Sequence, residues 1–492
     1  MSESKSKTEL LRQIGIITAI SCSVGSMIGS GIFKKPGIMA TQLGSPELLV
    51  LVWIVTGLMT LFGALSIAEI AGMIHEPGGQ YIYFNKSYND FIGFLYGWAV
   101  FAVIQTGSIA SMAYVFSDSL GYFVNFPRFS PSIESFTIHL PFIGAITPLK
   151  FIGLKLCTIG LILFLTAVNY VGVKFGSIVQ VTFTSLKIFA IVAIVVLAIF
   201  LGHGNIEHFY KSADLSSISN TSIFLGFIMA MSGAFWAYDG WINVTYLAGE
   251  VKNPQKNLPR ALFFAVVIVM AVYILVNLAY IYIIPVDEMA MKYKQAELTG
   301  GSYLVATDVA SSFWEGMGGT IIAAAVMLST FGAVNGTIMM SARVHFAMSK
   351  EGLFFKGLKN VHPKFNTPAN SLLIQGIWAS IMVFSGTFDQ LTDMIIFVSW
   401  IFYGTAAFGV FMLRKRWPER YRPYKVWGYP IVPLLFVLFS LIYVVFTLYT
   451  DVLNFVDGKS PLINSIMGVV LVSLGIPGYI YWKKKKNNSS IY

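Results

Sequence analysis

The fold is decided at residues 25–33, which read GSMIGSGIF inside a long apolar run. Three glycines and two serines within seven residues weaken an α-helix, because each glycine costs up to about 1 kcal/mol relative to alanine. Gly25 and Gly29 also form a GxxxG pair, which is typical of close helix packing. The pattern therefore allows two interpretations: a packing face, or an unwound stretch that exposes backbone amides and carbonyls in the middle of a membrane.

A second interrupted stretch follows at residues 232–241, which read SGAFWAYDGW. Its carboxylate, Asp239, lies about midway along the apolar segment 221–249, and a charge at that depth is costly and is a functional candidate by default. Two interrupted helices at corresponding positions in two halves of a chain point to a transporter binding site. The halves share no convincing residue-level similarity, so the repeat is inferred from spacing alone.

Composition places both stretches in a membrane protein. Of the 492 residues, 56% are hydrophobic and only 11% are charged, against roughly 25% charged in a soluble domain. Apolar runs of about 20 residues are long enough to cross the hydrocarbon core, where the backbone must be helical. We therefore predict an all-α polytopic membrane protein with twelve transmembrane helices. The predicted spans cover residues 14–43, 46–73, 88–122, 149–171, 177–202, 221–249, 259–284, 316–349, 368–387, 389–415, 429–449 and 461–482.

The spans suggest an organisation in two repeats. We predict a cytoplasmic N-terminus at 1–13, a first five-helix repeat at 14–202 and a second, inverted repeat at 221–415; helices 11 and 12 then occupy 429–482, and a cytoplasmic C-terminus 483–492. The longest loops are too short for a separate domain. The loop at 285–315, with Asp308 and Trp314, is expected to fold as a small lid of short helices over an outer vestibule.

Charge placement excludes a nucleic-acid partner and orients the chain. The net charge is +10, but the lysines and arginines lie in short tracts between spans, mostly on the side shared with the N-terminus. This bias places both termini in the cytoplasm. Cys22 and Cys157 both lie inside spans, so a disulfide framework is not supported.

The chemistry of the two interruptions favours a zwitterionic ligand. Amides around Ser30 and Gly31 begin the second half of helix one, where the positive end of the helix dipole suits a carboxylate. Carbonyls freed near Met27, Trp236 and Asp239 suit an ammonium group. A ligand that carries both groups a short distance apart is an α-amino acid.

At these residues the sequence resembles the L-type amino-acid transporter branch of the amino acid–polyamine–organocation superfamily, and in particular bacterial serine/threonine-type exchangers. The matching segments are 28–33 (IGSGIF), 68–70 (AEI), 77–83 (PGGQYIY), 166–170 (TAVNY), 237–241 (AYDGW), 249–254 (GEVKNP), 257–261 (NLPRA), 331–336 (FGAVNG), 341–343 (SAR) and 349–352 (SKEG). The resemblance implies a five-plus-five inverted repeat with discontinuous helices 1 and 6, two further helices, and sodium-independent amino-acid exchange without a cofactor or metal.

The resemblance also implies site residues. The family's carboxylate site maps to Gly29, Ser30 and Gly31, its amino-group site to the backbone carbonyls of Met27, Trp236 and Asp239, and its aromatic gate to Trp236. Animal members bond to a heavy subunit through a cysteine in the loop after span three. Residues 123–148 contain no cysteine, so no disulfide-linked heavy subunit is expected. The expected location is a bacterial inner (plasma) membrane.

Several further residues are open to a structural or a functional interpretation. In the family, a lysine at Lys187 replaces a sodium ion and binds carbonyls of helix one; the alternative is a snorkelling lysine. Asp239 either braces the unwound turn or reads the side chain of a dibasic substrate. Asn335 and Trp400 either line the pocket or pack between helices. Glu69 and Arg343 are either solvated at an interface or form an ion pair that closes an inner gate.

The resulting hypothesis is a secondary transporter that exchanges neutral and, because Trp236 is bulky, small L-amino acids. A proton-coupled symporter in which Lys187 titrates, and a broader exchanger that accepts dibasic amino acids, remain the alternatives. A channel is disfavoured because no filter motif repeats. An enzyme is disfavoured because His75-Glu76 lacks the second histidine of a zinc motif, and no catalytic residues are expected.

Overall fold

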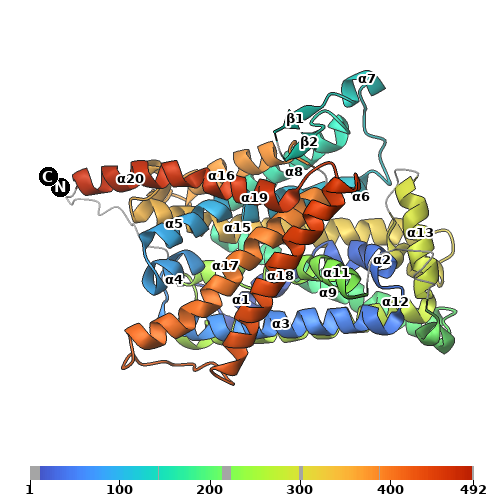
Figure 1. The fold of residues 1–492 in the computed structure, drawn as a ribbon, viewed down its shortest axis with the longest axis horizontal. Helices are drawn as coiled ribbons and strands as arrows, with labels where there is room; N and C mark the ends of the chain where they lie inside the picture. Colours follow the sequence, from blue (N-terminus) through green and yellow to red (C-terminus); the bar gives the residue numbers. More distant parts are fainter. Residues whose placement is uncertain (1–11, 142, 213–222, 299–302, 387, 490–492) are drawn as a thin grey trace.

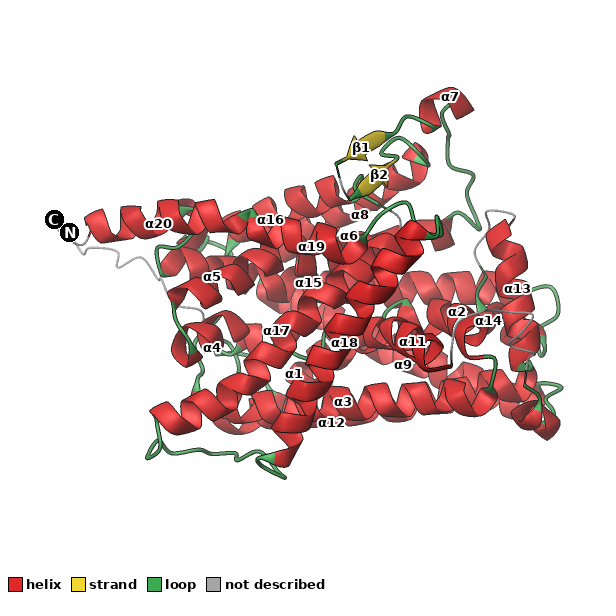
Figure 2. Ribbon diagram, viewed as in Figure 1, coloured by secondary structure: helices red, strands yellow, loops and turns green. Residues whose placement is uncertain are grey.

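The computed structural model describes residues 12–141, 143–212, 223–298, 303–386 and 388–489. Nearly all of its regular structure is helical, as Figure 2 shows, and the predicted all-α polytopic fold is confirmed. Long helices run along the longest axis of the molecule, with α3 and α12 side by side at one edge (Figure 1).

The first half of the chain builds the first five spans. Its helices are α1 (Ile16–Met27), α2 (Gly31–Leu43), α3 (Pro46–Met73), α4 (Gln80–Ser87), α5 (Asp90–Ala99), the π-helical turn η1 (Val100–Ile104), α6 (Gln105–Leu120), α8 (Ile152–Val171), α9 (Val173–Leu201) and the 3₁₀ turn η2 (Ile206–Tyr210). Helices α5, η1 and α6 follow one another without a gap and together make the third span.

The second half begins with another broken helix. Its helices are α11 (Ile223–Tyr238), the 3₁₀ turn η3 (Asn243–Leu247), α12 (Pro254–Ile283), α13 (Val286–Leu298), α14 (Val305–Ser311), α15 (Gly318–Lys350), the 3₁₀ turn η4 (Lys356–Lys359), α16 (Ala369–Met382), α17 (Phe388–Arg416), α18 (Ile431–Val456), α19 (Asn464–Ser473) and α20 (Gly475–Ser489).

Eleven helical segments among the described residues are long and apolar enough to cross a membrane. The remaining predicted span, 368–387, corresponds to α16, whose 14 residues are shorter than the others. At about 1.5 Å per residue this helix is shorter than the roughly 30 Å hydrocarbon core. It packs against α8, α6 and α15, and the arrangement remains consistent with twelve spans.

Helices one and six break where the sequence predicts. Helix α1 ends at Met27, the next residues are not helical, and α2 begins at Gly31. Helix α11 ends at Tyr238 and the chain turns through Gly240, whose φ of +95° is a conformation that favours glycine. The discontinuous helices 1 and 6 are therefore confirmed.

The glycines of helix one serve different purposes, so both interpretations of the segment hold in part. A Cβ on Gly25 would overlap the Gln180 side chain of α9, which is the close packing expected of GxxxG. A Cβ on Gly31 would lie 2.6 Å from Cα of Ala237, because the two broken helices touch there. A Cβ on Gly29 would meet only ordinary contacts, at 3.7 Å or more.

The loop at 285–315 folds as the expected short helices, α13 and α14, and both pack against α2. Lys292 and the Tyr303 hydroxyl each bond to Asp308, at 2.8 and 2.9 Å. Burial and the neighbouring Asp308 carboxylate raise the pKa of Tyr303 well above its usual value, so the hydroxyl keeps the proton that it donates. The pair of helices is therefore tied together at one end of the second half of helix one.

The loop between α6 and α8, at residues 123–148, contains the strands of the described structure, which the sequence did not predict. After the single turn α7 (Pro131–Glu134), β1 (Ile138–Leu140) pairs antiparallel with β2 (Gly144–Ile146), in register from Ile138 opposite Ile146. Ala145 then donates a backbone bond of 3.0 Å to Pro461, so the hairpin is fixed to the loop before α19.

Candidate functional site

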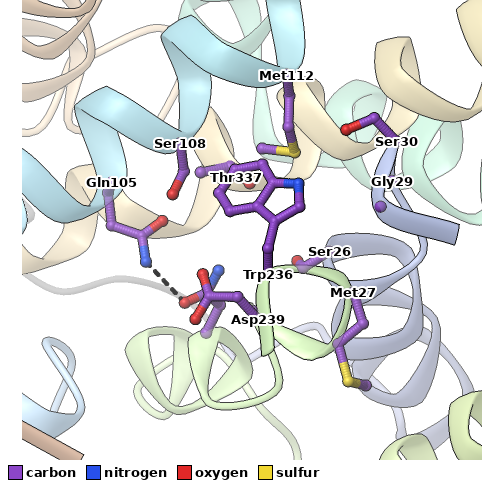
Figure 3. A pocket seen from close by; sticks show the side chains of 13 residues that line it. Ser26, Met27, Gly29, Ser30, Gln105, Ser108, Met112, Trp236, Asp239 and Thr337 are labelled. Atoms are coloured by element: carbon purple, nitrogen blue, oxygen red, sulfur yellow. Dashed lines mark hydrogen bonds between the residues drawn. The ribbon is translucent and has the colours of Figure 1, made fainter. Parts of the chain in front are cut away.

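The two breaks face one another across a small cavity in the middle of the bundle (Figure 3). Its walls come from four elements: the α1–α2 break, the α11–η3 break, α6 and α15. The lining residues are Ser26, Met27, Gly29, Ser30, Gly31, Gln105, Ser108, Met112, Trp236, Asp239, Gly240, Asn243 and Thr337. The cavity leaves about 20 Å³ for the centres of water molecules. That is room for about one water molecule.

The residues expected to bind a carboxylate form one wall of this cavity. Gly29, Ser30 and Gly31 all line it, and Gly31 is the first residue of α2, whose leading amides have no preceding turn to bond to. The Ser30 hydroxyl is buried and has no hydrogen-bond partner among the described residues. Orphan amides at the positive end of a helix, beside an unpaired hydroxyl, suit an anionic group.

The residues expected to bind an ammonium group, Met27, Trp236 and Asp239, line the same cavity, Met27 from the break in helix one and the other two from the break in helix six. Their carbonyls are not equally free, however, since Trp236 already accepts a 3.3 Å bond from the Asp239 amide.

Tyr273 of α12 is a site residue that the sequence analysis missed. Its hydroxyl lies 2.9 Å from the Met27 carbonyl and 2.8 Å from the Ala237 carbonyl, so it joins the two broken helices. One hydroxyl proton cannot bond fully to both oxygens at once, so one carbonyl keeps capacity for a further donor. The only sequence signal was a tyrosine inside an apolar span.

Lys187 of α9 has the contacts expected from the resemblance. Its Nζ donates to the carbonyls of Gly25 and Ile28, at 2.6 and 2.5 Å, and its residue is 1% exposed. Ser329 of α15 also bonds to the Ile28 carbonyl, at 3.2 Å. A snorkelling lysine would reach water, so that alternative is wrong. The ammonium group therefore binds two carbonyls at the break in helix one, and it shares the Ile28 carbonyl with Ser329.

The side chain of Asp239 is held by α17. Its Oδ1 accepts a 2.7 Å bond from the Tyr403 hydroxyl. Trp241, two residues on, packs edge-on against Tyr403 at 5.3 Å. This geometry favours the bracing interpretation of Asp239 over a freely available reader of substrate side chains.

Asn335 and Trp400 lie outside the cavity lining. Asn335 Oδ1 accepts a 2.9 Å bond from Asn169, and its amide donates to the Gly176 carbonyl at 3.2 Å, so it joins α15 to α8 and α9. Trp400 packs against Phe235 at 4.0 Å and belongs to an aromatic cluster with α18. The packing interpretation fits both residues, and Thr337, two residues after Asn335 in α15, lines the cavity instead.

Trp236 covers the cavity as the expected aromatic side chain. It is 6% exposed and its indole spreads over the space between α6 and the broken helices (Figure 3). Phe388 at the start of α17 packs against it in a T-shaped contact at 5.8 Å.

Glu69 and Arg343 neither pair with each other nor lie solvated at an interface, so both interpretations of these two residues are wrong. Arg343 pairs with Glu250, at 2.8 Å, in a site where both side chains are at least 95% buried. Glu69 pairs with Arg414 and Arg422 and accepts a 2.7 Å bond from the Val426 amide. The physical reason is that Glu69 is fully buried against the α17–α18 connection, where two guanidinium groups satisfy it.

Glu250 also ties the start of the chain to this region. Its backbone carbonyl accepts bonds from the amides of Gln13 and Ile14, both 2.9 Å, and the Lys252 amide donates 2.8 Å to the Ile14 carbonyl. The segment before α1, the loop after η3 and α15 are therefore joined at one place. Glu250 lies within a motif quoted for the resemblance, but spacing alone did not pair it with Arg343.

Comparison with known proteins agrees with the architecture. A model of the amino acid permease family matches residues 14–472. The serine/threonine exchanger SteT of Bacillus subtilis (strain 168) is 32% identical over 479 residues, covering 97% of this chain and 98% of the relative. The human b(0,+)-type amino acid transporter 1 is 31% identical over 443 residues, covering 89% and 83%. The human large neutral amino acids transporter small subunit 2 is 30% identical over 483 residues, covering 97% and 82%.

The family match covers almost the whole described bundle, both broken helices included. The identity to three kinds of amino-acid transporter extends over more than four fifths of each chain. This multi-pass membrane protein belongs to the amino acid permease family of the amino acid–polyamine–organocation superfamily.

Proposed function

We propose that this protein is a sodium-independent exchanger of small neutral L-amino acids that works by alternating access. The observation that carries the proposal is the pair of broken helices, which place an unpaired Ser30 hydroxyl, helix-start amides and backbone carbonyls around one cavity. A zwitterion satisfies both walls at once. The relatives, named as amino-acid exchangers and transporters rather than enzymes, support the same class of function.

In the proposed complex the substrate carboxylate binds at Gly29, Ser30 and Gly31. The ammonium group binds the carbonyl wall at Met27, Trp236 and Asp239, where Tyr273 leaves one acceptor incompletely bonded. Each step of transport then opens the cavity to one side by moving the half-helices that form these walls.

Two features favour a small and neutral side chain. The Trp236 indole spreads over the space beside the broken helices, which leaves little room there for a large side chain. The Asp239 carboxylate already accepts a hydrogen bond from Tyr403, so its charge stabilises the unwound turn rather than a cationic substrate side chain. We therefore propose serine, threonine or alanine in preference to arginine, lysine or aromatic amino acids.

Lys187 supplies the proposed coupling element. Its ammonium group binds two carbonyls of helix one, which is chemistry that a bound cation could otherwise provide. A built-in cation removes the need for sodium.

We expect exchange to be unchanged when external sodium is replaced by choline. The measurement is uptake of labelled serine into proteoliposomes preloaded with unlabelled amino acid, with and without a pH gradient. Loss of uptake in choline would contradict the role of Lys187. Concentrative uptake into vesicles without internal amino acid, driven by a pH gradient, would instead show the proton-coupled symporter.

We propose Arg343 and Glu250 as the inner gate, with Glu69 as an anchor of the α17–α18 connection. The pair joins α15 to the loop after helix six and to the segment before α1, so opening at this end must separate it. The bias of lysines and arginines supports both termini in the cytoplasm of a cell, and hence this end as the inner one. A bacterial plasma membrane fits the relative from Bacillus subtilis.

Replacing Gly29 by valine is expected to abolish exchange while the protein still folds. A Cβ at this position meets Met112 Sδ at 3.7 Å and Ala333 Cβ at 3.8 Å, both ordinary contacts, so the added methyl groups go toward the substrate. Gly31 cannot serve for this test, because a Cβ there would collide with Ala237 and damage helix packing.

Gly160→Val provides the matched control, because Gly160 lies on an exposed face of α8 with nothing within 4 Å of its added Cβ. Both variants are compared by gel filtration and by serine exchange. Normal exchange by the Gly29 variant would mean that the substrate does not approach the break in helix one.

A further inference from the structure

One wall of the cavity has no role in the amino-acid backbone chemistry described above. It belongs to α6, which contributes Gln105, Ser108 and Met112. Gln105 is the first residue after the π-helical turn η1, and such turns inside longer helices are frequent at functional sites. A glutamine buried to 1% exposure at the centre of a membrane span calls for hydrogen-bond partners.

The Gln105 amide is only half satisfied. Its Nε2 donates a 2.9 Å bond to Asn243 Oδ1 in η3, which fixes the orientation of the amide. The opposite atom, Oε1, is buried and has no hydrogen-bond partner among the described residues. Figure 3 shows this oxygen on the side of the amide that faces Ser108 and the indole of Trp236, away from the bond to Asn243.

Ser108 adds a second hydrogen-bond acceptor to the same wall. Its hydroxyl donates a 2.7 Å bond to the Ile104 carbonyl, so its single proton is used within the helix and its lone pairs remain. The nearby Asp239 carboxylate is also an acceptor, already held by Tyr403. Two acceptors on α6 therefore line the cavity, Gln105 Oε1 and the hydroxyl oxygen of Ser108.

The direction of a bound amino acid follows by elimination. If its carboxylate faces the α2 start and its ammonium group faces the broken-helix carbonyls, the side chain is left for the walls formed by α6 and by Thr337 of α15, beneath Trp236. A short side chain with a hydrogen-bond donor would satisfy Gln105 Oε1. An apolar side chain of the same size would leave that acceptor buried without a partner, which is the situation that gives strong discrimination.

We infer that Gln105 reads a side-chain hydroxyl, so that the site prefers serine and threonine over apolar amino acids of equal size. This inference rests on the proposed function, because it assigns specificity within the same site. Gln105 acts here as a substrate-binding residue, and Ser108 supplies a second acceptor beside it.

The test compares threonine with its isostere valine, and serine with alanine, in exchange by proteoliposomes. The unmodified protein is expected to favour threonine over valine in kcat/KM by roughly tenfold or more, the effect of leaving one buried acceptor unpaired. Gln105→Met keeps the length of the side chain but removes the acceptor. It is expected to bring the threonine-to-valine ratio close to one, mainly by weakening threonine.

Two further variants distinguish recognition of the substrate hydroxyl by Gln105 from a purely structural role of its side chain. Gln105→Glu keeps an acceptor at the same position and is expected to retain the preference for threonine. Ser111→Ala removes another buried hydroxyl of α6, one that bonds to the Ser108 carbonyl and does not line the cavity, and it is expected to leave the ratio unchanged. Thermal unfolding in detergent checks that each variant is folded.

The outcomes distinguish this inference from the proposed function. Equal exchange of threonine and valine by the unmodified protein would overturn the role of Gln105 and leave amino-acid exchange standing. A Gln105→Met variant in which kcat/KM falls by the same factor for threonine and for valine would also overturn that role. This is the result expected if Gln105 only supports the structure of the site. Failure of the unmodified protein to exchange any of the four amino acids would overturn the proposed function itself. The ratio measured for the unmodified protein decides the preference even if Gln105→Met does not fold.

Discussion

Replacing Lys187 by methionine is expected to reduce amino-acid exchange by about a hundredfold or more. The ammonium group makes two short bonds to carbonyls of helix one, and each bond from a charged donor is worth about 1.5–3 kcal/mol. Methionine leaves the Gly25 and Ile28 carbonyls without these bonds in a buried site. The break in helix one then relaxes, and the amides and carbonyls that it presents to the substrate lose their positions.

Lys155→Met is the matched control for this variant. Lys155 is also buried, in α8, and its Nζ also bonds to two carbonyls, but these belong to Thr147 and Pro148 in the loop before that helix. Initial exchange rates, normalised to the amount of folded protein, are compared for the two variants. Equal losses of exchange rate would show that Lys187 contributes no more than any buried lysine that donates to two backbone carbonyls. A rate near that of the unmodified protein in Lys187→Met would remove the lysine from the transport cycle.

The breaks in helices one and six could be predicted because their cause is local. Glycine and serine in succession weaken the helix whatever surrounds them, and Asp239 marks the second break by its charge at mid-membrane depth. The expected residues at the breaks consequently line the cavity: Met27, Gly29, Ser30, Gly31, Trp236 and Asp239. The contacts of Lys187 could be anticipated only through the family resemblance.

The remaining part of the site depends on which helices become neighbours, and spacing along the chain does not determine that. Glu69 and Arg343 are both near helix ends and opposite in charge, yet each finds a nearer partner in Glu250 or in the arginines of the α17–α18 connection. Tyr273 reaches the breaks from α12 because α12 packs on α1. Gln105 carried a usable signal, since QTGS at 105–108 is a polar run inside an apolar span.

Replacing Arg343 by methionine is expected to lower the free energy of unfolding by about 3–5 kcal/mol, because it leaves the buried Glu250 carboxylate without its partner. The guanidinium group also bonds to the Met339 carbonyl within α15, and this bond is lost as well. The measurement is thermal unfolding in detergent. The double variant Arg343→Met/Glu250→Met is expected to recover most of the loss, since removing both charges of a buried pair is often neutral.

The stable double variant then decides whether the pair is a gate. Thr245→Cys, introduced where Cys22 and Cys157 are replaced by alanine, places a thiol in η3 between the cavity residue Asn243 and Glu250. If the ion pair holds this end closed, the double variant spends more time open there. A water-soluble thiol reagent should then label the cysteine several-fold faster than in the protein with the pair intact. Because stability is restored, faster labelling cannot be ascribed to unfolding. Unchanged labelling together with unchanged exchange would show that Arg343 and Glu250 only hold α15 to the loop after helix six.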